Sequence, residues 1–305
     1  MGCLKSCLDY LGLDISDGWL CGGTGHAFVL NISSNLCPSG PTAWKSERIF
    51  QLGRNLGYTF DGVFSHKSML DFKEKQRNAY DLVKKSIDIG YPCYGWELNI
   101  AEFYLINGYD KTGYLYKDTD GQQKDSEKWD TLGETGIGFI EIYSVCPGEA
   151  VNVRKIVKDS LEFAVEHART RKYLLPNYES GLQGYETWIK GMRKKTATKD
   201  GVSYNAAVWS ECRKYGIDFL LEAKEKLDNS DLFNEAIECY RIASQNLRSV
   251  VDLYSFRVPP DYETLITDTK KAETAIKYLV EAREAENKGL KELENIVSIL
   301  ENNIH

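Results

Sequence analysis

The sequence predicts an α+β domain followed by a domain built only of helices. Between Gly90 and Gly121, three short runs of aromatic and aliphatic residues alternate with turn residues, as in consecutive antiparallel strands. After residue 148 the hydrophobic period changes from about two residues to about 3.6, which is typical of amphipathic helices. We therefore expect two domains, residues 1–147 and residues 148–305.

The first domain is expected to contain a small, mostly antiparallel sheet and two helices. Cys3 to Leu11 carries leucines about one helical turn apart and is followed by Gly12, which predicts a short helix. The glycine-rich run 22–25 predicts a flexible loop leading into a strand from His26 to Ile32. The remaining elements are a helix and four strands: Phe72 to Asp88, Gly90 onward, Glu102 to Tyr109, Tyr114 to Lys117 and Ile137 to Val145.

The second domain is predicted to be a helical bundle. Apolar residues recur there on one helical face, with Gly and Pro between the periodic segments. Gly289 lies inside the last segment and is expected to divide it into two helices. The predicted helices are Val151 to Lys172, Ser180 to Lys194, Val202 to Leu227, Asp231 to Leu253 and Asp261 to Asn302.

The charge distribution argues against nucleic acid as the main ligand. The chain has a net charge of −7, and its first 150 residues hold 14 Lys and Arg against 20 Asp and Glu. Neutralising phosphates needs a concentrated basic face, and the basic cluster at residues 193–195 is too short to supply one. An acidic first domain fits a cationic small molecule better.

The cysteine pattern favours free thiols in a reducing compartment. Eight cysteines are scattered without paired spacings and no secretory leader precedes them, so we expect a cytoplasmic protein. No run approaches the roughly 20 apolar residues that a membrane span requires. Five soft ligands fall within the first 37 residues, but none forms a tight Cys-x-x-Cys pair, so we expect no metal. The glycine-rich run lacks the Lys-Ser/Thr of a phosphate loop, and we expect no cofactor.

Two sets of residues resemble a known family. Gly90 and Pro92, the run Gly108-Tyr109-Asp110, Gly113 and Asp118, preceded by a cysteine-bearing first helix, resemble the papain-like N-terminal domains similar to the butirosin-biosynthesis acyltransferase. They resemble more distantly the bacterial peptidases that cut double-glycine leaders. Residues 178–188, YESGLQGYETW, are similar to the helical C-terminal region that accompanies the butirosin-type domain in some bacterial proteins.

This resemblance implies the residues of a catalytic site. It implies that Cys3, at the start of the first helix, is the nucleophile, and that Asp118 is the acid of the third strand. Glu102 stands where the family carries its histidine, and a carboxylate beside a thiol opposes thiolate formation. Either His26 approaches from the glycine-rich run as the base, or Glu102 acts as acid or base at a raised pKa. We expect the ligand to lie against Cys7, Trp19, Gly23, Thr24 and Trp96.

Two functions follow from this reading. The first is a cysteine-dependent acyltransferase or amidase, in which Cys3 forms a thioester with a small-molecule or acyl-carrier substrate and an amine or water resolves it. The second is a non-catalytic protein that binds a small molecule on the same scaffold, with Glu102 in place of the histidine. In both, the helical domain could form a homodimer surface.

Overall fold

The computed structural model describes residues 1–45, 47–118, 121–124, 126–228, 231–254 and 263–302. The chain divides into two compact units. The α+β unit comprises Met1–Ser16 and Gly57–Ala150, and the helical unit comprises Asp17–Leu56 and Val151–His305. The α+β unit ends at Ala150, close to the domain boundary at residues 147–148 that the sequence predicts.

The assignment of residues 17–56 differs from the two consecutive domains that the sequence predicts. These residues belong to the helical unit. The reason is their apolar side chains: Val29, Leu30 and Trp44 are buried in one core together with Trp188 and Trp209 of the helical bundle. Burial of this apolar surface against helices outweighs proximity in sequence.

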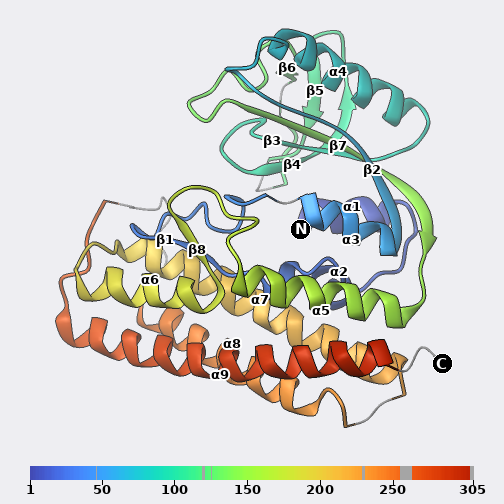
Figure 1. The fold of residues 1–305 in the computed structure, drawn as a ribbon. Coiled ribbons are helices and arrows are strands. Elements are labelled where there is room, and N and C mark those ends of the chain that lie inside the picture. Colours follow the sequence, from blue (N-terminus) through green and yellow to red (C-terminus); the bar gives the residue numbers. More distant parts are fainter. Residues whose placement is uncertain (46, 119–120, 125, 229–230, 255–262, 303–305) are drawn as a thin grey trace. The chain divides into compact units, whose positions relative to one another are not determined.

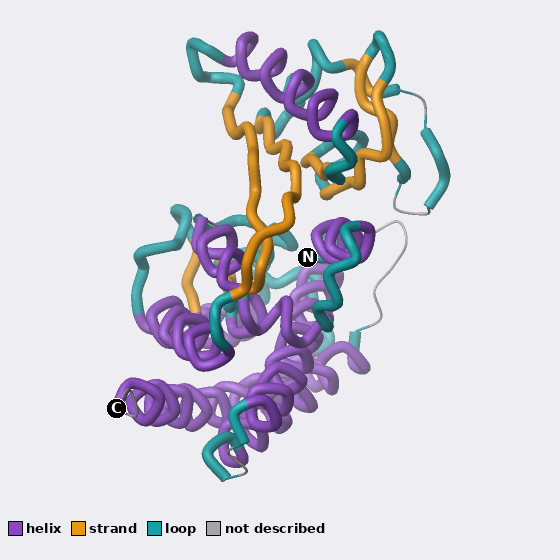
Figure 2. Tube along the Cα trace, turned by 90° about the vertical axis from the view of Figure 1, so that its right-hand side faces the viewer, coloured by secondary structure: helices purple, strands orange, loops and turns teal. Residues whose placement is uncertain are grey.

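The α+β unit is organised by an antiparallel sheet with the strand order β2-β7-β3-β4-β5-β6. Strand β3 pairs with both β4 and β7, and Tyr94 lies between Leu105 and Tyr143 in this register. Helix α4 lies on one side of the sheet and helix α1 on the other (Figures 1 and 2). The bounds are α1 Gly2–Tyr10, β2 Leu56–His66, α4 Phe72–Asp88, β3 Cys93–Trp96, β4 Phe103–Tyr109, β5 Gly113–Tyr116, β6 Glu127–Lys128 and β7 Phe139–Ala150.

The two faces of this sheet carry different residues. The face toward α4 forms a core with Ala79, Val83, Ile106 and Ile142. Successive side chains of a strand alternate between faces, so Tyr94, Trp96 and their cross-strand partners Leu105 and Phe103 lie on the other face. The helix from Phe72 to Asp88 and the strands near residues 103–109 and 113–116 are confirmed.

The helical unit is not all-helical. Strands β1 and β8 form a separate two-stranded antiparallel sheet, in which Asn31 pairs with Ser180. The predicted strand from His26 to Ile32 is wrong, because η1 occupies its first half. The bounds in this unit are α2 Asp17–Gly23, η1 His26–Phe28, β1 Asn31–Ser33, α3 Glu47–Asn55, α5 Val153–Arg169, β8 Tyr178–Ser180, α6 Gly181–Arg193, α7 Lys199–Lys226, α8 Asn234–Leu253 and α9 Thr269–Asn302.

The glycines of this unit allow close helix packing. The predicted flexible loop at residues 22–25 is wrong, because α2 extends through Gly23. A Cβ atom on Gly22 would lie 2.1 Å from Cγ of Phe219 on α7. Gly289 does not interrupt α9, where an added Cβ would lie 3.0 Å from the Tyr240 ring. The predicted start of this helix at Asp261 lies outside the described residues.

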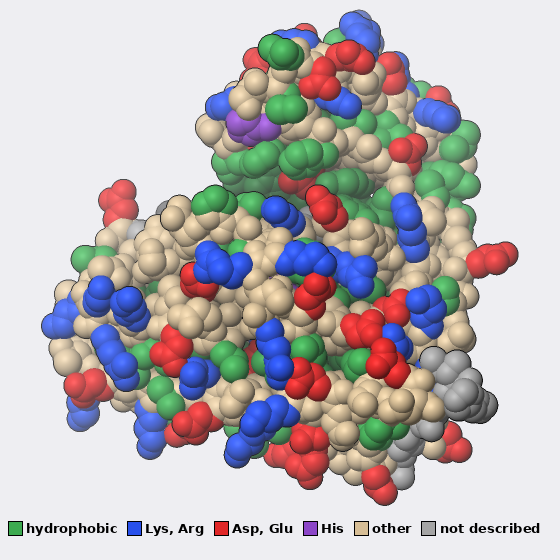
Figure 3. All heavy atoms as spheres, viewed as in Figure 1, with side chains coloured by type: hydrophobic (Ala, Val, Ile, Leu, Met, Phe, Trp, Pro, Cys, Tyr) green, Lys and Arg blue, Asp and Glu red, His purple; other side chains and the backbone are tan. Residues whose placement is uncertain are grey.

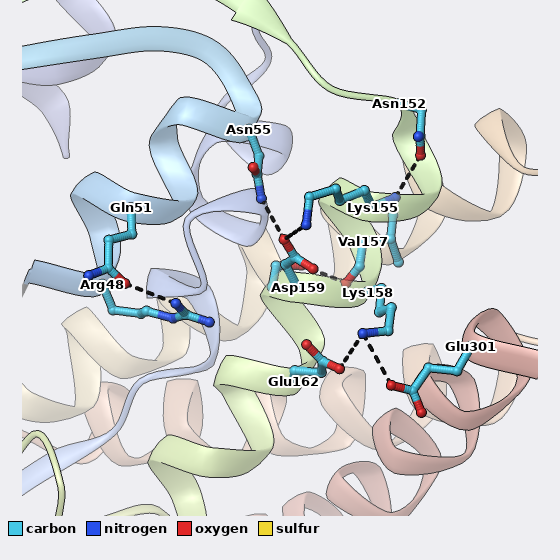
Figure 4. A network of polar contacts seen from close by, with 11 residues as sticks. Arg48, Gln51, Asn55, Asn152, Lys155, Val157, Lys158, Asp159, Glu162 and Glu301 are labelled. Carbon is cyan, nitrogen blue, oxygen red and sulfur yellow. Dashed lines mark hydrogen bonds and ion pairs between the residues drawn. The ribbon is translucent and has the colours of Figure 1, made fainter. Parts of the chain in front are cut away.

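Polar contacts connect the ends of α3, α5 and α9 (Figure 4). Asn55 donates a hydrogen bond of 2.9 Å to Asp159, which Lys155 also contacts at 2.7 Å. Lys158 joins α5 to Glu301 of α9 at 3.1 Å. The main-chain N–H of Val151 donates to the carbonyl oxygen of Asn55, so the two segments that leave this unit for β2 and β7 start side by side.

Candidate functional site

Cys3 lies in the first turn of α1, as the sequence predicts. The helix ends at Tyr10 because Gly12 adopts a positive φ of 71° and closes a Schellman motif, in which Leu13 N–H donates to the carbonyl oxygen of Leu8. Cys3, at the other end of the helix, is partly exposed. Its Sγ donates a hydrogen bond to the carbonyl oxygen of Phe103, the first residue of β4, over 3.3 Å. The first helix therefore reaches the start of the second hairpin strand.

The surroundings of Cys3 hold its thiol in the protonated form. Burial raises the pKa of Cys3, the amino group of Met1 opposes this, and the Glu102 carboxylate adds to the rise. Burial removes water that would stabilise a thiolate, and a nearby carboxylate repels it. The hydrogen bond to Phe103 uses the thiol as a donor, which a thiolate cannot be. The site thus favours a neutral thiol at neutral pH.

Glu102 lies at the end of the turn that joins β3 to β4. Its carbonyl oxygen accepts from the N–H of Glu97, over 2.8 Å. Burial raises the pKa of the Glu102 carboxyl group, and the Met1 amino group lowers it in part. The charge of the Met1 amino group lowers the pKa of both Cys3 and Glu102, and the Glu102 carboxylate raises the pKa of Cys3. The three groups therefore form one electrostatic cluster.

Asp118 follows β5, where the resemblance implies a catalytic acid. Its carboxylate contacts Lys124 at 3.2 Å and accepts from Asn99 at 3.3 Å. Its main-chain groups close a turn with Gly121 and Gln122. The negative charge of Asp118 is therefore compensated within its own loop. These contacts stabilise the loop that follows β5, which is a structural role for Asp118.

His26 lies in the helical unit, whereas Cys3 lies in the α+β unit. Its ring stacks on Trp44 with 6.4 Å between ring centroids. Burial lowers the pKa of His26 to about 3, and the nearby His167 and Arg213 add to this effect. Its Nδ1 has no hydrogen-bond partner among the described residues. An imidazole with so low a pKa is a weak base for a thiol at neutral pH.

The predicted ligand-binding residues divide between the units. Cys7 is buried in α1, and burial raises the pKa of its thiol strongly. Trp96 packs edge-to-face on Phe103 at 5.0 Å, and its indole N–H has no partner among the described residues. These two residues share the α+β unit with Cys3.

The other predicted ligand-binding residues lie in α2 or directly after it. Trp19 packs on Phe219 at 5.1 Å, and the Thr24 hydroxyl donates to the carbonyl oxygen of Leu20 at 2.8 Å. A Cβ on Gly23 would meet Leu56 at 2.7 Å. All three residues therefore have packing or hydrogen-bonding roles within the helical unit.

A carboxylate on the α1 side of the sheet was not predicted from the sequence. Glu141 of β7 is half-buried and accepts a hydrogen bond of 3.1 Å from the Tyr143 hydroxyl. Burial raises the pKa of Glu141, and this hydrogen bond opposes the rise. The register pairs Gly95 with Ile142, so one residue further along Trp96 lies beside Glu141. The alternation in Phe139-Ile140-Glu141-Ile142 was the available signal, since it places the acid opposite the buried isoleucines.

Neither a metal centre nor a membrane span is found in the part of the chain that the structure describes. There, no group of three or more His, Cys, Asp or Glu side chains is arranged to hold a metal ion. No helix within the same residues combines the length and the apolar character that a membrane crossing requires.

Comparison with known proteins adds no family assignment. The chain matches no model of a known protein family, and a search of curated proteins finds no relative.

Proposed function

We propose that the α+β unit is a papain-like scaffold that binds a small organic amine without covalent catalysis. The observation that carries this proposal is the state of Cys3: its thiol donates a hydrogen bond to Phe103, and burial and Glu102 raise its pKa. A cysteine nucleophile needs the opposite, a thiolate stabilised by a cation or by a base. The geometry therefore supports binding over thioester formation.

The ligand class follows from two carboxylates of this unit, Glu102 beside the thiol and Glu141 of β7. Glu102 and Glu141 are both partly desolvated, with raised pKa values. A bound ammonium group would favour their ionised forms and would lower those pKa values again. Aromatic side chains such as Trp96 and Phe103 lie on the same sheet face and provide apolar contact area. An amine with an apolar body suits both features.

The alternative is a cysteine-dependent acyltransferase or amidase with Cys3 as its nucleophile. It is favoured by the position of Cys3 in the first helical turn, where unpaired amide groups stabilise negative charge. The Met1 amino group acts in the same direction by lowering the pKa of Cys3. This alternative requires a base that outweighs burial and Glu102.

Alkylation of Cys3 by iodoacetamide, followed by mass spectrometry of the N-terminal peptide across pH, tests the proposal. We expect slow labelling at pH 7 in the wild type, faster labelling in Glu102→Gln, and no change in His26→Ala. Fast labelling at pH 7 that slows only in His26→Ala would establish the enzyme instead. Equal labelling in all three proteins would show that neither residue influences Cys3, and the site would be wrong.

A further inference from the structure

A groove of about 450 Å³ lies in the α+β unit, between the turn that follows β2 and the loop that precedes β7. Met69, Leu70 and Phe72 form its apolar part, and Lys67, Lys73 and Glu134 form its polar part. We call it the Lys67 groove. It contains none of the residues discussed for the Cys3 site, and the inference below does not depend on that site.

Large apolar side chains around the Lys67 groove are exposed to solvent. Leu70 is fully exposed, and Phe64, Met69 and Ile137 are 58%, 56% and 42% exposed. They surround one backbone contact, in which Lys67 N–H donates to the carbonyl oxygen of Gly138 over 2.8 Å. Figure 3 shows hydrophobic, basic and acidic side chains interspersed on the surface of this unit. A clustered apolar surface of this kind is typical of an interaction site.

The polar side of the groove carries a positive charge that no carboxylate compensates among the described residues. The Lys67 ammonium donates to the carbonyl oxygens of Thr135, at 2.6 Å, and Gly136, at 3.4 Å. These oxygens fix its position without neutralising it. Lys73, in contrast, forms an ion pair with Glu134. The groove therefore complements a negative charge placed beside an apolar group.

The walls of the groove favour a polypeptide over an enclosed small molecule. Met69 and Leu70 stand out from the surface while Phe72 is buried, whereas small-molecule sites bury most of their ligand between concave walls. Phe64 belongs to β2, which is an outer strand of the sheet among the described residues, and a main chain can add to such a strand. Met69 in the lining has a flexible side chain, which can adapt to the shape of a polypeptide partner.

We propose that the Lys67 groove binds a partner polypeptide that inserts a large apolar side chain next to an acidic residue. The apolar side chain lies between Met69, Leu70 and Phe72. The acidic side chain pairs with the Lys67 ammonium. Recognition thus combines one buried anchor with one charge-assisted hydrogen bond.

The test uses the full chain and a short fluorescein-labelled peptide with Leu-Phe-Leu at its centre and Glu on both sides, measured by fluorescence anisotropy. Leu70→Ser removes the anchor contact. Lys67→Met removes the charge and keeps an unbranched apolar stem, which suits the position because Lys67 packs over Gly138. We expect each variant to weaken binding about tenfold. Ile89→Ser is the matched control, because Ile89 is 60% exposed in the same unit and does not line the groove.

Several outcomes overturn the proposal. No binding of the peptide, equal affinity in all variants, or equal affinity for a peptide with Lys in place of Glu each contradicts it. Sedimentation of the chain alone tests a second copy as the occupant: self-association lost in Leu70→Ser would assign the groove to a dimer contact. Displacement of the peptide by dodecanoate at submicellar concentration would assign it to a small amphiphile.

Discussion

Arg213 of α7 and Glu286 of α9 form an ion pair from which solvent is excluded. Their side chains are 0% and 1% exposed. The Arg213 Nε donates to Glu286 at 3.0 Å, and the Tyr185 hydroxyl donates to the same carboxylate at 2.8 Å. Arg213 also donates to the carbonyl oxygens of Ala27 and Val29. The pair therefore joins residues 27–29 to the bundle that they pack against.

Removing one partner of this pair leaves an uncompensated charge in the core. We expect Arg213→Met to lower the free energy of unfolding by about 3–5 kcal/mol, measured by urea denaturation. Arg248→Met is the control, because its pair with Asp252 spans 3.5 Å and is about 70% exposed, and should cost less than about 0.5 kcal/mol. Arg213→Met combined with Glu286→Leu should recover most of the loss. Equal effects of the two single variants would contradict the prediction.

The buried histidine His167 predicts loss of stability in acid. Burial lowers the pKa of His167 to about 4, and neither of its ring nitrogens has a hydrogen-bond partner among the described residues. The unfolded chain, with a histidine pKa near 6.5, therefore binds the proton first. The stability that depends on neutral His167 is fully present above about pH 6.5 and falls by about 1.4 kcal/mol per pH unit between pH 6.5 and 4. His26, whose pKa is lowered to about 3, adds a decline of its own over the same range.

Urea denaturation at pH 7, 6 and 5 measures this slope. We expect His167→Gln to lose stability at pH 7 and to show a smaller decline between pH 7 and pH 5 than the wild type. His66→Gln, in the other unit, serves as the control and should keep the wild-type slope. The linkage is wrong if His167→Gln declines as steeply as the wild type.

Gly22 tests the close packing of α2 on α7. A methyl group at this position would lie 2.1 Å from the Phe219 ring, so the two helices would have to separate. We expect Gly22→Ala to cost about 1–3 kcal/mol of unfolding free energy. Gly136→Ala introduces the same methyl group where nothing lies within 4 Å, and it should change stability by less than about 0.5 kcal/mol. A neutral Gly22→Ala would instead support the flexible loop that the sequence suggests.

Local patterns in the sequence predicted the elements that depend on local chemistry. The helix from Phe72 to Asp88 and the end of α1 before Gly12 follow from periodicity and a glycine at the helix C-terminus. The assignment of residues 17–56 could not be predicted, because it depends on which core buries their apolar side chains. The glycine-rich run 22–25 was predicted to be a flexible loop for the same reason. Glycines are equally typical of a flexible loop and of a close contact between helices, and only the packing partner distinguishes the two.

The positions of the candidate site residues depend on local patterns and on long-range pairing to different degrees. The helix that carries Cys3 and the strand whose first residue it contacts are both local patterns, so each element could be predicted. Glu141 was missed because its environment depends on the pairing of β7 with β3, which connects residues about 50 positions apart. The compensation of Asp118 by Lys124 also depends on how its loop closes.

Asp110, from the Gly-Tyr-Asp run that contributes to the family resemblance, stabilises the turn between β4 and β5. Its Oδ1 accepts hydrogen bonds from the N–H groups of Thr112, at 2.7 Å, and Gly113, at 3.0 Å, and from the Ser126 hydroxyl at 3.0 Å. These bonds, led by the one from Gly113, lower the pKa of Asp110. Its contribution is therefore present above its usual pKa of about 3.8 and is lost as the pH falls below that value.

We expect Asp110→Ala to accelerate amide hydrogen exchange in β4 and β5 at pH 7, because two turn N–H groups lose their acceptor. Asp110→Asn should show a smaller effect, since an amide oxygen still accepts. Asp81→Ala is the control, because Asp81 is an exposed residue of α4 that pairs only with Lys84 among the described residues. Unchanged exchange in Asp110→Ala would show that the run has no structural role in this turn, and iodoacetamide labelling of Cys3 in the same variant would then measure any influence on the site.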